Sequence, residues 1–198
     1  RSRRQRQMCI RDRTGNQIGA MTSAQVDALT STQFASLSAD ALLGMADRPL
    51  NNMSTTQLKA MSTTQISGLT FGQLGSINST QMAAWDSAQV GAMSTRHFDA
   101  LTTSTIASLS SDQLPGLTTA QMVALSMEQV AALTSVQTPK LNTDQLAAIQ
   151  VTDFAKLSTA AIAELSTAQI SALTTAQVGG MTTAQISAME SRDIAELT

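Results

Sequence analysis

Few side chains in this sequence could carry out acid–base chemistry. His97 is the only histidine, and it lies between Arg96 and Asp99. A general base needs a nucleophile or a substrate pocket within hydrogen-bonding reach, and a zinc site built on a pair of histidines needs a second one. Most segments of the chain have glutamine where this segment has His97. We therefore interpret His97 as a structural substitute for glutamine and predict no catalytic residue.

The acidic residues are spread along the chain rather than gathered in one segment. Calcium-binding loops place several oxygen ligands and a glycine at fixed offsets, and no segment has this spacing. Several carboxylates instead fall where a short helix would begin, and negative charge is favourable at that end of a helix. The sequence therefore predicts no metal site among the acidic residues, which include Asp27, Asp40, Asp86, Asp99, Asp112, Glu128, Asp144, Asp153 and Glu164.

Aromatic and sulfur-containing side chains fit a hydrophobic core better than a ligand site. Trp85 could stack on a ligand, but it occupies a position that is large and apolar along most of the chain. Methionine, which fills irregular space in cores, often holds the same position, at Met45, Met53, Met61, Met93, Met181 and Met189. Cys9 is the only cysteine, so it forms neither an intramolecular disulfide nor a cysteine-based zinc site. We predict no copper site and no cofactor.

These scattered residues belong to a repeat of eight residues, which must position them. The repeat is clearest in Leu173–Gly180 and Met181–Ala188. It reads large apolar, Ser/Thr, Ser/Thr, variable, Gln, large apolar, small, small, and we number these places one to eight. Place one recurs every eight residues from Met21 to Leu197 without insertion or deletion. Places one and six thus form two apolar columns, and we expect close packing at the small places seven and eight.

Places two and five together match the capping box of a helix. In this motif the Ser/Thr oxygen accepts a hydrogen bond from the N–H three residues later, and a Gln or Glu side chain returns to the first N–H. Place two departs from Ser, Thr, Asn or Asp only at Ala46, Gln150 and Glu190. We therefore predict one very short helix in each octad, capped at place two and running over places three to eight.

Such short helices are unstable by themselves in water and must stack on one another. A continuous helix is excluded, because eight residues are about 2.2 turns and the apolar columns would spiral around it. The prediction is therefore an all-α solenoid over residues 14–198. No pattern of 16 or 24 residues indicates whether one coil contains two octads or three.

Proline residues interrupt this pattern at three points. Pro115 and Pro139 occupy place seven, where a proline removes a helical hydrogen bond and clashes with a carbonyl one turn earlier. Pro49 occupies place five. We expect shortened or irregular helices around Met45–Asn52 and Val136–Lys140.

A β-solenoid is the alternative fold. Thr, Val and Ile favour strands, and a short fixed repeat is typical of that fold too. However, inward positions in a strand alternate with period two, whereas the apolar places here are one and six. If the fold were β, the ranks of threonine would resemble those on ice-binding proteins, and ice binding would follow from that resemblance.

Charge separates the first thirteen residues from the rest of the chain. Residues 1–13 carry six Arg and one Asp, whereas residues 14–198 are acidic, with six Lys/Arg and thirteen Asp/Glu. The repeats lack the basic stripe that phosphate backbones require, so we expect no nucleic-acid binding. Residues 1–13 do not share the repeat and resemble translated sequencing-adapter DNA. We interpret this leader as non-native or disordered and residues 14–198 as a fragment of a longer array.

The octad resembles the Leu-Thr-Thr-x-Gln-Ile/Val-x-Ala repeats of large bacterial surface or secreted proteins that are adhesin-like in organisation. The resemblance covers residues 14–198. It implies an extracellular or cell-surface location and a non-enzymatic role as a spacer or adhesive rod. The partner would then be a cell-surface protein or a glycan. A protein- or peptide-binding scaffold is the alternative, because solenoids often bind along a concave face. No apolar run is long enough to span a membrane.

Overall fold

The computed structural model describes residues 14–45 and 50–195, and all the regular secondary structure in these ranges is helical. No strand occurs within these two ranges, which confirms the all-α prediction and removes the flat β face on which the ice-binding alternative depended. The leader, Cys9, Ala46, Pro49 and Leu197 lie outside the described residues.

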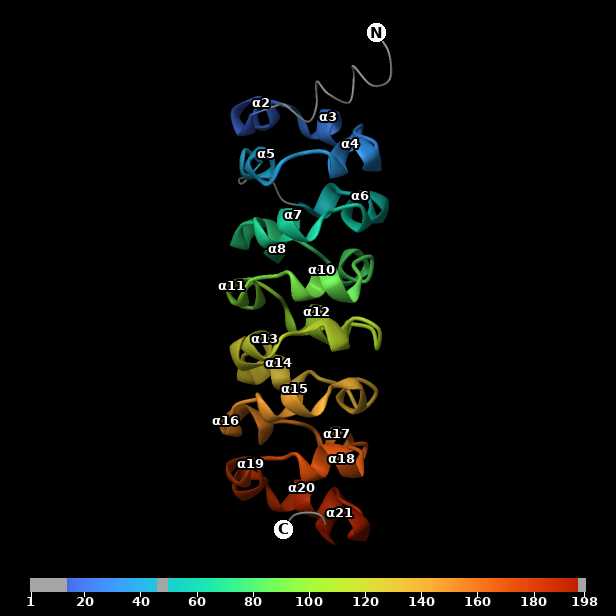
Figure 1. The fold of residues 1–198 in the computed structure, drawn as a ribbon, viewed down its shortest axis with the longest axis vertical. Helices are drawn as coiled ribbons and strands as arrows, with labels where there is room; N and C mark the ends of the chain where they lie inside the picture. Colours follow the sequence, from blue (N-terminus) through green and yellow to red (C-terminus); the bar gives the residue numbers. More distant parts are fainter. Residues whose placement is uncertain (1–13, 46–49, 196–198) are drawn as a thin grey trace. The chain divides into compact units, whose positions relative to one another are not determined.

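The chain divides into two compact units, Arg1–Ala100 and Leu101–Thr198 (Figure 1). The helices of the first unit are α2 (Gly15–Gly19), α3 (Ser23–Asp27), α4 (Ser31–Ala35), α5 (Ala39–Leu43), η1 (Leu50–Asn52), α6 (Thr55–Lys59), α7 (Thr63–Ser67), α8 (Phe71–Gly75), α9 (Ser79–Met82), α10 (Ser87–Gly91) and α11 (Thr95–Phe98). Those of the second are α12 (Thr103–Ala107), η2 (Leu114–Gly116), α13 (Thr119–Ala124), α14 (Met127–Ala131), η3 (Thr138–Lys140), α15 (Thr143–Ala147), α16 (Val151–Phe154), α17 (Thr159–Ala163), α18 (Thr167–Ser171), α19 (Thr175–Gly180), α20 (Thr183–Ala188) and α21 (Ser191–Ala195).

Most of the described octads form one short α-helix with the predicted cap. In α7 the Ser62 hydroxyl accepts a hydrogen bond from the Gln65 backbone N–H at 3.2 Å, and Gln65 Oε1 accepts one from the Ser62 N–H at 2.8 Å. Ser62 is extended, with φ −75° and ψ 158°, so the helix cannot begin earlier. Most helices end at place seven, one residue before the predicted end. No described residue has a positive φ, so the helices end without a left-handed glycine.

Places one and six form the core of each unit, as predicted. Phe34, Phe98 and Phe154 at place six are fully buried, and most place-one side chains within the coils are almost fully buried. Burying a side chain of this size contributes roughly 1.5–3 kcal/mol. The expectation of close packing at place seven was wrong, because most place-seven residues are exposed and only place eight is mainly half-buried. Place seven lies about 100° around the helix from place six and therefore points away from the core.

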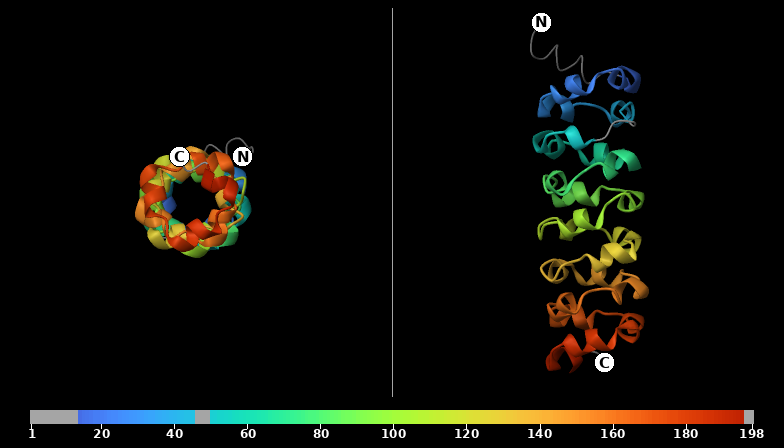
Figure 2. Two further views of the ribbon diagram at one scale, coloured as in Figure 1. Left: turned by 90° about the horizontal axis from the view of Figure 1, so that it is seen from below. Right: turned by 180° about the vertical axis from the view of Figure 1, so that it is seen from behind.

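One coil contains between three and four octads, which is more than the two or three considered from the sequence. Hydrogen bonds between successive coils join residues 28 and 31 positions apart, which is three and a half to nearly four octads. Helices three octads apart also contact each other, as α7 and α10 do in the first unit and α15 and α18 in the second. Seen end on, the helices of the second unit follow one another around a ring (Figure 2, left).

The prolines that are described lie in irregular segments, as expected. Pro115 and Pro139 fall within the 3-10 helices η2 and η3, where the tighter turn replaces the α-helix that proline would disrupt. Thr138, the polar exception at place six, begins η3 and is fully buried. Its hydroxyl donates to the Ala161 carbonyl at 3.0 Å, which satisfies the buried oxygen.

Candidate functional site

Glutamine at place five is the dominant polar group inside both units. Gln65 Nε2 donates to the Phe34 carbonyl at 3.2 Å and to the Leu37 carbonyl at 2.8 Å, and both carbonyls lie at the C-terminal end of α4. Its Oε1 atom is already engaged in the cap of α7. We call the equivalent set the glutamine ladder. It comprises Gln57, Gln65, Gln73, Gln81, Gln89, Gln129, Gln137, Gln145, Gln169, Gln177 and Gln185.

The ladder joins the start of one helix to the end of a helix in the preceding coil. The last carbonyls of any helix lack partners within that helix, and burying them unbonded is costly. The ladder glutamines supply these bonds and are themselves only 1–5% exposed. The sequence pattern predicts the capping half of this role but not the half that joins the coils. The available signal was that place five never contains glutamate, although glutamate would serve a capping box equally well.

His97 takes the place of a ladder glutamine, as the sequence predicted. Its Nδ1 atom accepts a hydrogen bond from the Ser94 N–H at 3.1 Å, and Nε2 lies 2.8 Å from the Leu69 carbonyl. Because the first partner can only donate and the second can only accept, the neutral ring carries its proton on Nε2. Burial lowers the pKa of His97 below its ordinary value of 6.5, while the hydrogen bond to Leu69 acts in the opposite direction.

Four place-five residues of the second unit depart from this pattern. Thr105 exchanges a hydrogen bond with the Thr102 hydroxyl at 2.9 Å, and Asp153 accepts one from Thr152 at 3.1 Å. In the octad of Asp153, Gln150 at place two supplies the contact between coils, since its Nε2 donates to the Val123 carbonyl at 3.0 Å. Ala161, the third, has no polar side chain, and Asp193, the fourth, accepts a hydrogen bond from the Glu190 N–H at 3.2 Å. The ladder is therefore interrupted at these places, and in the octad of Asp153 a glutamine at place two replaces it.

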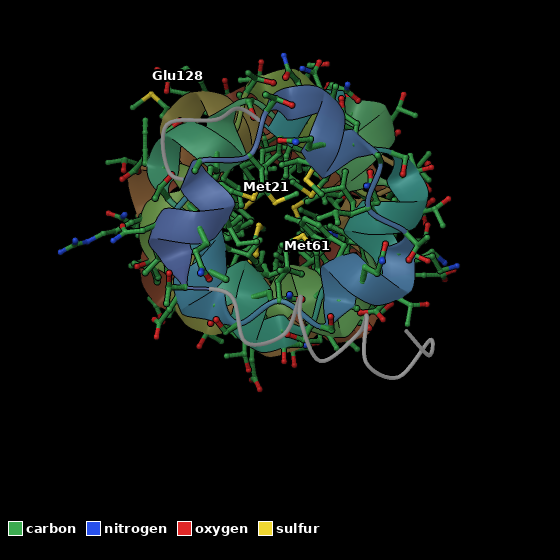
Figure 3. The ribbon with its side chains drawn as sticks, turned by 90° about the horizontal axis from the view of Figure 1, so that it is seen from above. Met21, Met61 and Glu128 are labelled. Carbon is green, nitrogen blue, oxygen red and sulfur yellow. The ribbon has the colours of Figure 1, made fainter. Side chains whose placement is uncertain are left out.

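Trp85 and most of the place-one methionines lie in the core, as predicted, whereas Met181 is only half-buried. Trp85 is 3% exposed, and its Nε1–H donates to the Leu58 carbonyl at 3.0 Å. In the first unit, Met21 and Met61 point toward the interior of the coils (Figure 3). These side chains therefore fill the space that the ring of helices encloses.

The acidic side chains do not gather into a metal site within the described residues. No group of three or more His, Cys, Asp or Glu side chains there could hold a metal ion. Glu128 in the second unit points outward (Figure 3). Its pKa is lowered because its carboxylate accepts hydrogen bonds from its own backbone N–H and from the Ser126 hydroxyl, the latter at 2.9 Å. The charge stabilises the start of α14.

The outer surface of each unit is mainly polar and small, with a few apolar side chains. Place four is exposed in every described octad, and places two and three are exposed or half-buried. In the second unit Val123, Met127, Val136 and Val151 are 36–66% exposed. Val123 and Val151 belong to successive coils, and the Gln150–Val123 bond holds those coils together beside them. These residues are the only large apolar side chains exposed on the described part of that unit, apart from Ile194.

Comparison with known proteins assigns the repeat to a family. The ALTTAQ repeat matches residues 95–127, 106–143, 146–183 and 171–198, which together span slightly more than half of the chain. The chain belongs to the ALTTAQ repeat family. The six residues Ala172–Gln177 spell the family's name, from place eight of one octad to place five of the next. No curated protein matches the chain.

The structure gives each letter of the ALTTAQ repeat a position. The leucine is core, the first threonine caps the helix, and the glutamine is the ladder residue, as in Leu173, Thr174 and Gln177. The second threonine and the alanine that follows it lie on the outer surface. Among the described helices, none has the length and apolar character needed to cross a bilayer.

Proposed function

We propose that this ALTTAQ array is a non-enzymatic structural region that acts as a spacer or adhesive rod in a bacterial surface or secreted protein. The observation that supports this most directly is the use of polar side chains in the interior. The ladder glutamines and His97 are committed to backbone hydrogen bonds that hold helices and coils together. A repeat of this kind supplies length and a continuous surface.

A spacer makes a specific prediction about length. Inserting seven consensus octads adds about two coils, because one coil contains between three and four octads. We expect the maximum dimension measured by small-angle X-ray scattering to rise by the same amount for each such insertion. A constant dimension, or a growth that scales only with the cube root of mass, would contradict the spacer role.

Adhesion to a cell-surface protein or a glycan requires a second test. Beads coated with the full chain should attach to cells that carry the partner, and beads coated with a scrambled-octad chain of equal composition should not. Enzymatic removal of surface glycans or trypsin treatment of the cells distinguishes the two partner classes. If the scrambled chain attaches equally well, the array is a passive spacer.

A protein- or peptide-binding scaffold is the second candidate, and the exposed apolar residues of the second unit favour it. Exposed apolar side chains that neighbour one another often mark an interaction surface. The double variant Val123→Thr and Val151→Thr removes the pair across the coils, and Ala160→Thr on α17 is a matched surface control. Loss of bead attachment in the double variant only would favour the scaffold over the spacer.

A further inference from the structure

We propose that His97 makes the contact between α8 and α11 in the first unit an acid-sensitive joint, closed by the neutral imidazole and opened when the ring is protonated. The inference goes beyond the proposed spacer role, since it concerns how one coil contact responds to pH. It rests on the geometry of His97, Ser94 and Leu69.

The neutral ring satisfies both of its neighbours, and the protonated ring cannot. When Nδ1 is unprotonated it accepts the Ser94 N–H, while Nε2–H donates to Leu69. A proton on Nδ1 would set two donors against each other across the 3.1 Å gap to Ser94. Relieving that conflict requires the ring to rotate, which also moves Nε2 away from the Leu69 carbonyl. Protonation therefore opposes the helix cap and the coil contact together.

No charged side chain on α8 or on the two residues before it would stabilise a protonated His97. Helix α8, which contacts α11, and the preceding residues Leu69 and Thr70 contain no titratable side chain. On its own helix, His97 is followed by Asp99 and preceded by Arg96, both exposed and of opposite charge. The ring is 4% exposed, so a positive charge on it is poorly solvated.

Every ladder glutamine provides the natural control, because its amide makes the same two kinds of bond at all pH values. Because burial lowers the pKa of His97, the folded chain binds fewer protons than the unfolded chain below pH 6.5. The contribution of neutral His97 to the free energy of unfolding is therefore complete above pH 6.5. It is lost as the pH falls from 6.5 toward the pKa of His97 in the folded chain. His97→Gln removes the titrating group and keeps the hydrogen-bonding pattern.

The test compares the full chain with His97→Gln and His97→Ala by thermal unfolding at several pH values between 7.5 and 5. We expect the midpoint of the wild-type chain to fall by a few degrees more than that of His97→Gln. The difference in unfolding midpoint between the wild-type chain and His97→Ala should become smaller as the pH falls, because protonation already weakens the contact that His97 makes in the wild-type chain. Parallel pH profiles for all three chains would overturn the proposal.

Two further measurements locate the effect. The imidazole of His97 should titrate below 6.5 by NMR, and a titration at or above that value would also overturn the proposal. The Ser94 amide, which is the capped donor, should lose protection from hydrogen exchange at pH 5 in the wild type relative to His97→Gln. The Ser62 amide, which donates to Gln65 Oε1, should show the same protection from hydrogen exchange in both chains. Equal protection at Ser94 in both chains would contradict a joint at this position.

Discussion

At the scale of residues, a ladder glutamine acts on two helices at once because its amide carries both an acceptor and a donor. Gln169 illustrates this in the second unit. Its Oε1 accepts from the Ser166 N–H at 2.9 Å, and its Nε2 donates to the carbonyls of Thr138 and Leu141 at 2.9 and 2.7 Å. Ionised glutamate at this place could perform only the first task, because its carboxylate has no donor. The amide therefore links local helix formation to the stacking of coils.

Removing a ladder amide should cost much more than removing a glutamine that only caps a helix. Gln65→Ala leaves the Phe34 and Leu37 carbonyls without this buried donor and should lower the free energy of unfolding by about 3 kcal/mol. Gln25 caps α3 through its Oε1 at 2.8 Å but is exposed, so Gln25→Ala should cost about 1 kcal/mol. Urea unfolding of the two variants measures the difference. Equal costs would show that capping accounts for the whole effect.

The donor half of the ladder can be isolated by changing one atom. Gln65→Glu keeps the capping oxygen but turns the other carboxylate oxygen toward two carbonyls, which should raise the pKa of the new carboxyl above about 4.3. The variant should then lose stability as the pH rises from about 4 toward neutrality, because its folded state binds more protons. Unfolding midpoints measured across this range check the sign. Gln25→Glu, on the exposed helix, should lack this loss.

At the scale of elements, the α-helices are four to six residues long, and several of them end directly before an extended residue at place one. Met181 after α19 has φ −65° and ψ 142°, and Leu125 after α13 has φ −62° and ψ 135°. This path uses ordinary backbone conformations, so place eight tolerates Ala, Ser or Gly. Small size matters there only where another helix approaches closely.

The approach of α2 and α5 identifies three glycines, Gly15, Gly19 and Gly44, that should not tolerate a methyl group. A Cβ atom on Gly44 would clash with the Gly15 carbonyl oxygen, so Gly44→Ala forces the two backbones apart. We expect a loss of about 2 kcal/mol in the free energy of unfolding. Gly72 in α8 has nothing within 4 Å of its Cβ position, so Gly72→Ala should be neutral or should stabilise by up to about 1 kcal/mol. Thermal unfolding of both variants tests the contrast, and similar midpoints would contradict it.

At the scale of the whole molecule, each unit repeats one contact rule from coil to coil. The rule joins place five to place six 31 residues earlier and to place one 28 residues earlier, both in the first unit and in the second. Because most octads follow it, the pairing partner of a coil is set by position and not by a unique sequence. The array should therefore tolerate changes of length in whole octads.

Deleting one octad tests this rule directly. Without residues 165–172, Gln177 would lie 31 residues after Thr138 and 28 after Leu141, which are the partners of Gln169 in the intact chain. The deletion should keep the helical circular dichroism per residue and cooperative unfolding. Deleting only residues 165–168 places apolar and polar columns out of register and should reduce the helical signal. A similar loss in both deletions would contradict a register set by the octad.

The sequence by itself determined the local structure of this protein. Fixed spacing of Ser/Thr and Gln specifies a helix cap within four residues, and the apolar places one and six specify which face is buried, because both effects act over one helical turn. Pro115 and Pro139 likewise predicted the irregular helices, because a missing backbone N–H disrupts the helix that contains it.

Only the tertiary structure decided how the octads combine. The number of octads in a coil depends on the angle between each short helix and the next. Octads of similar sequence do not reveal that angle. The same angle places Gln65 Nε2 on the carbonyls of the preceding coil and turns place seven outward. The second role of glutamine was therefore hidden, because its partners lie 28 and 31 residues away and belong to the backbone, which every sequence shares.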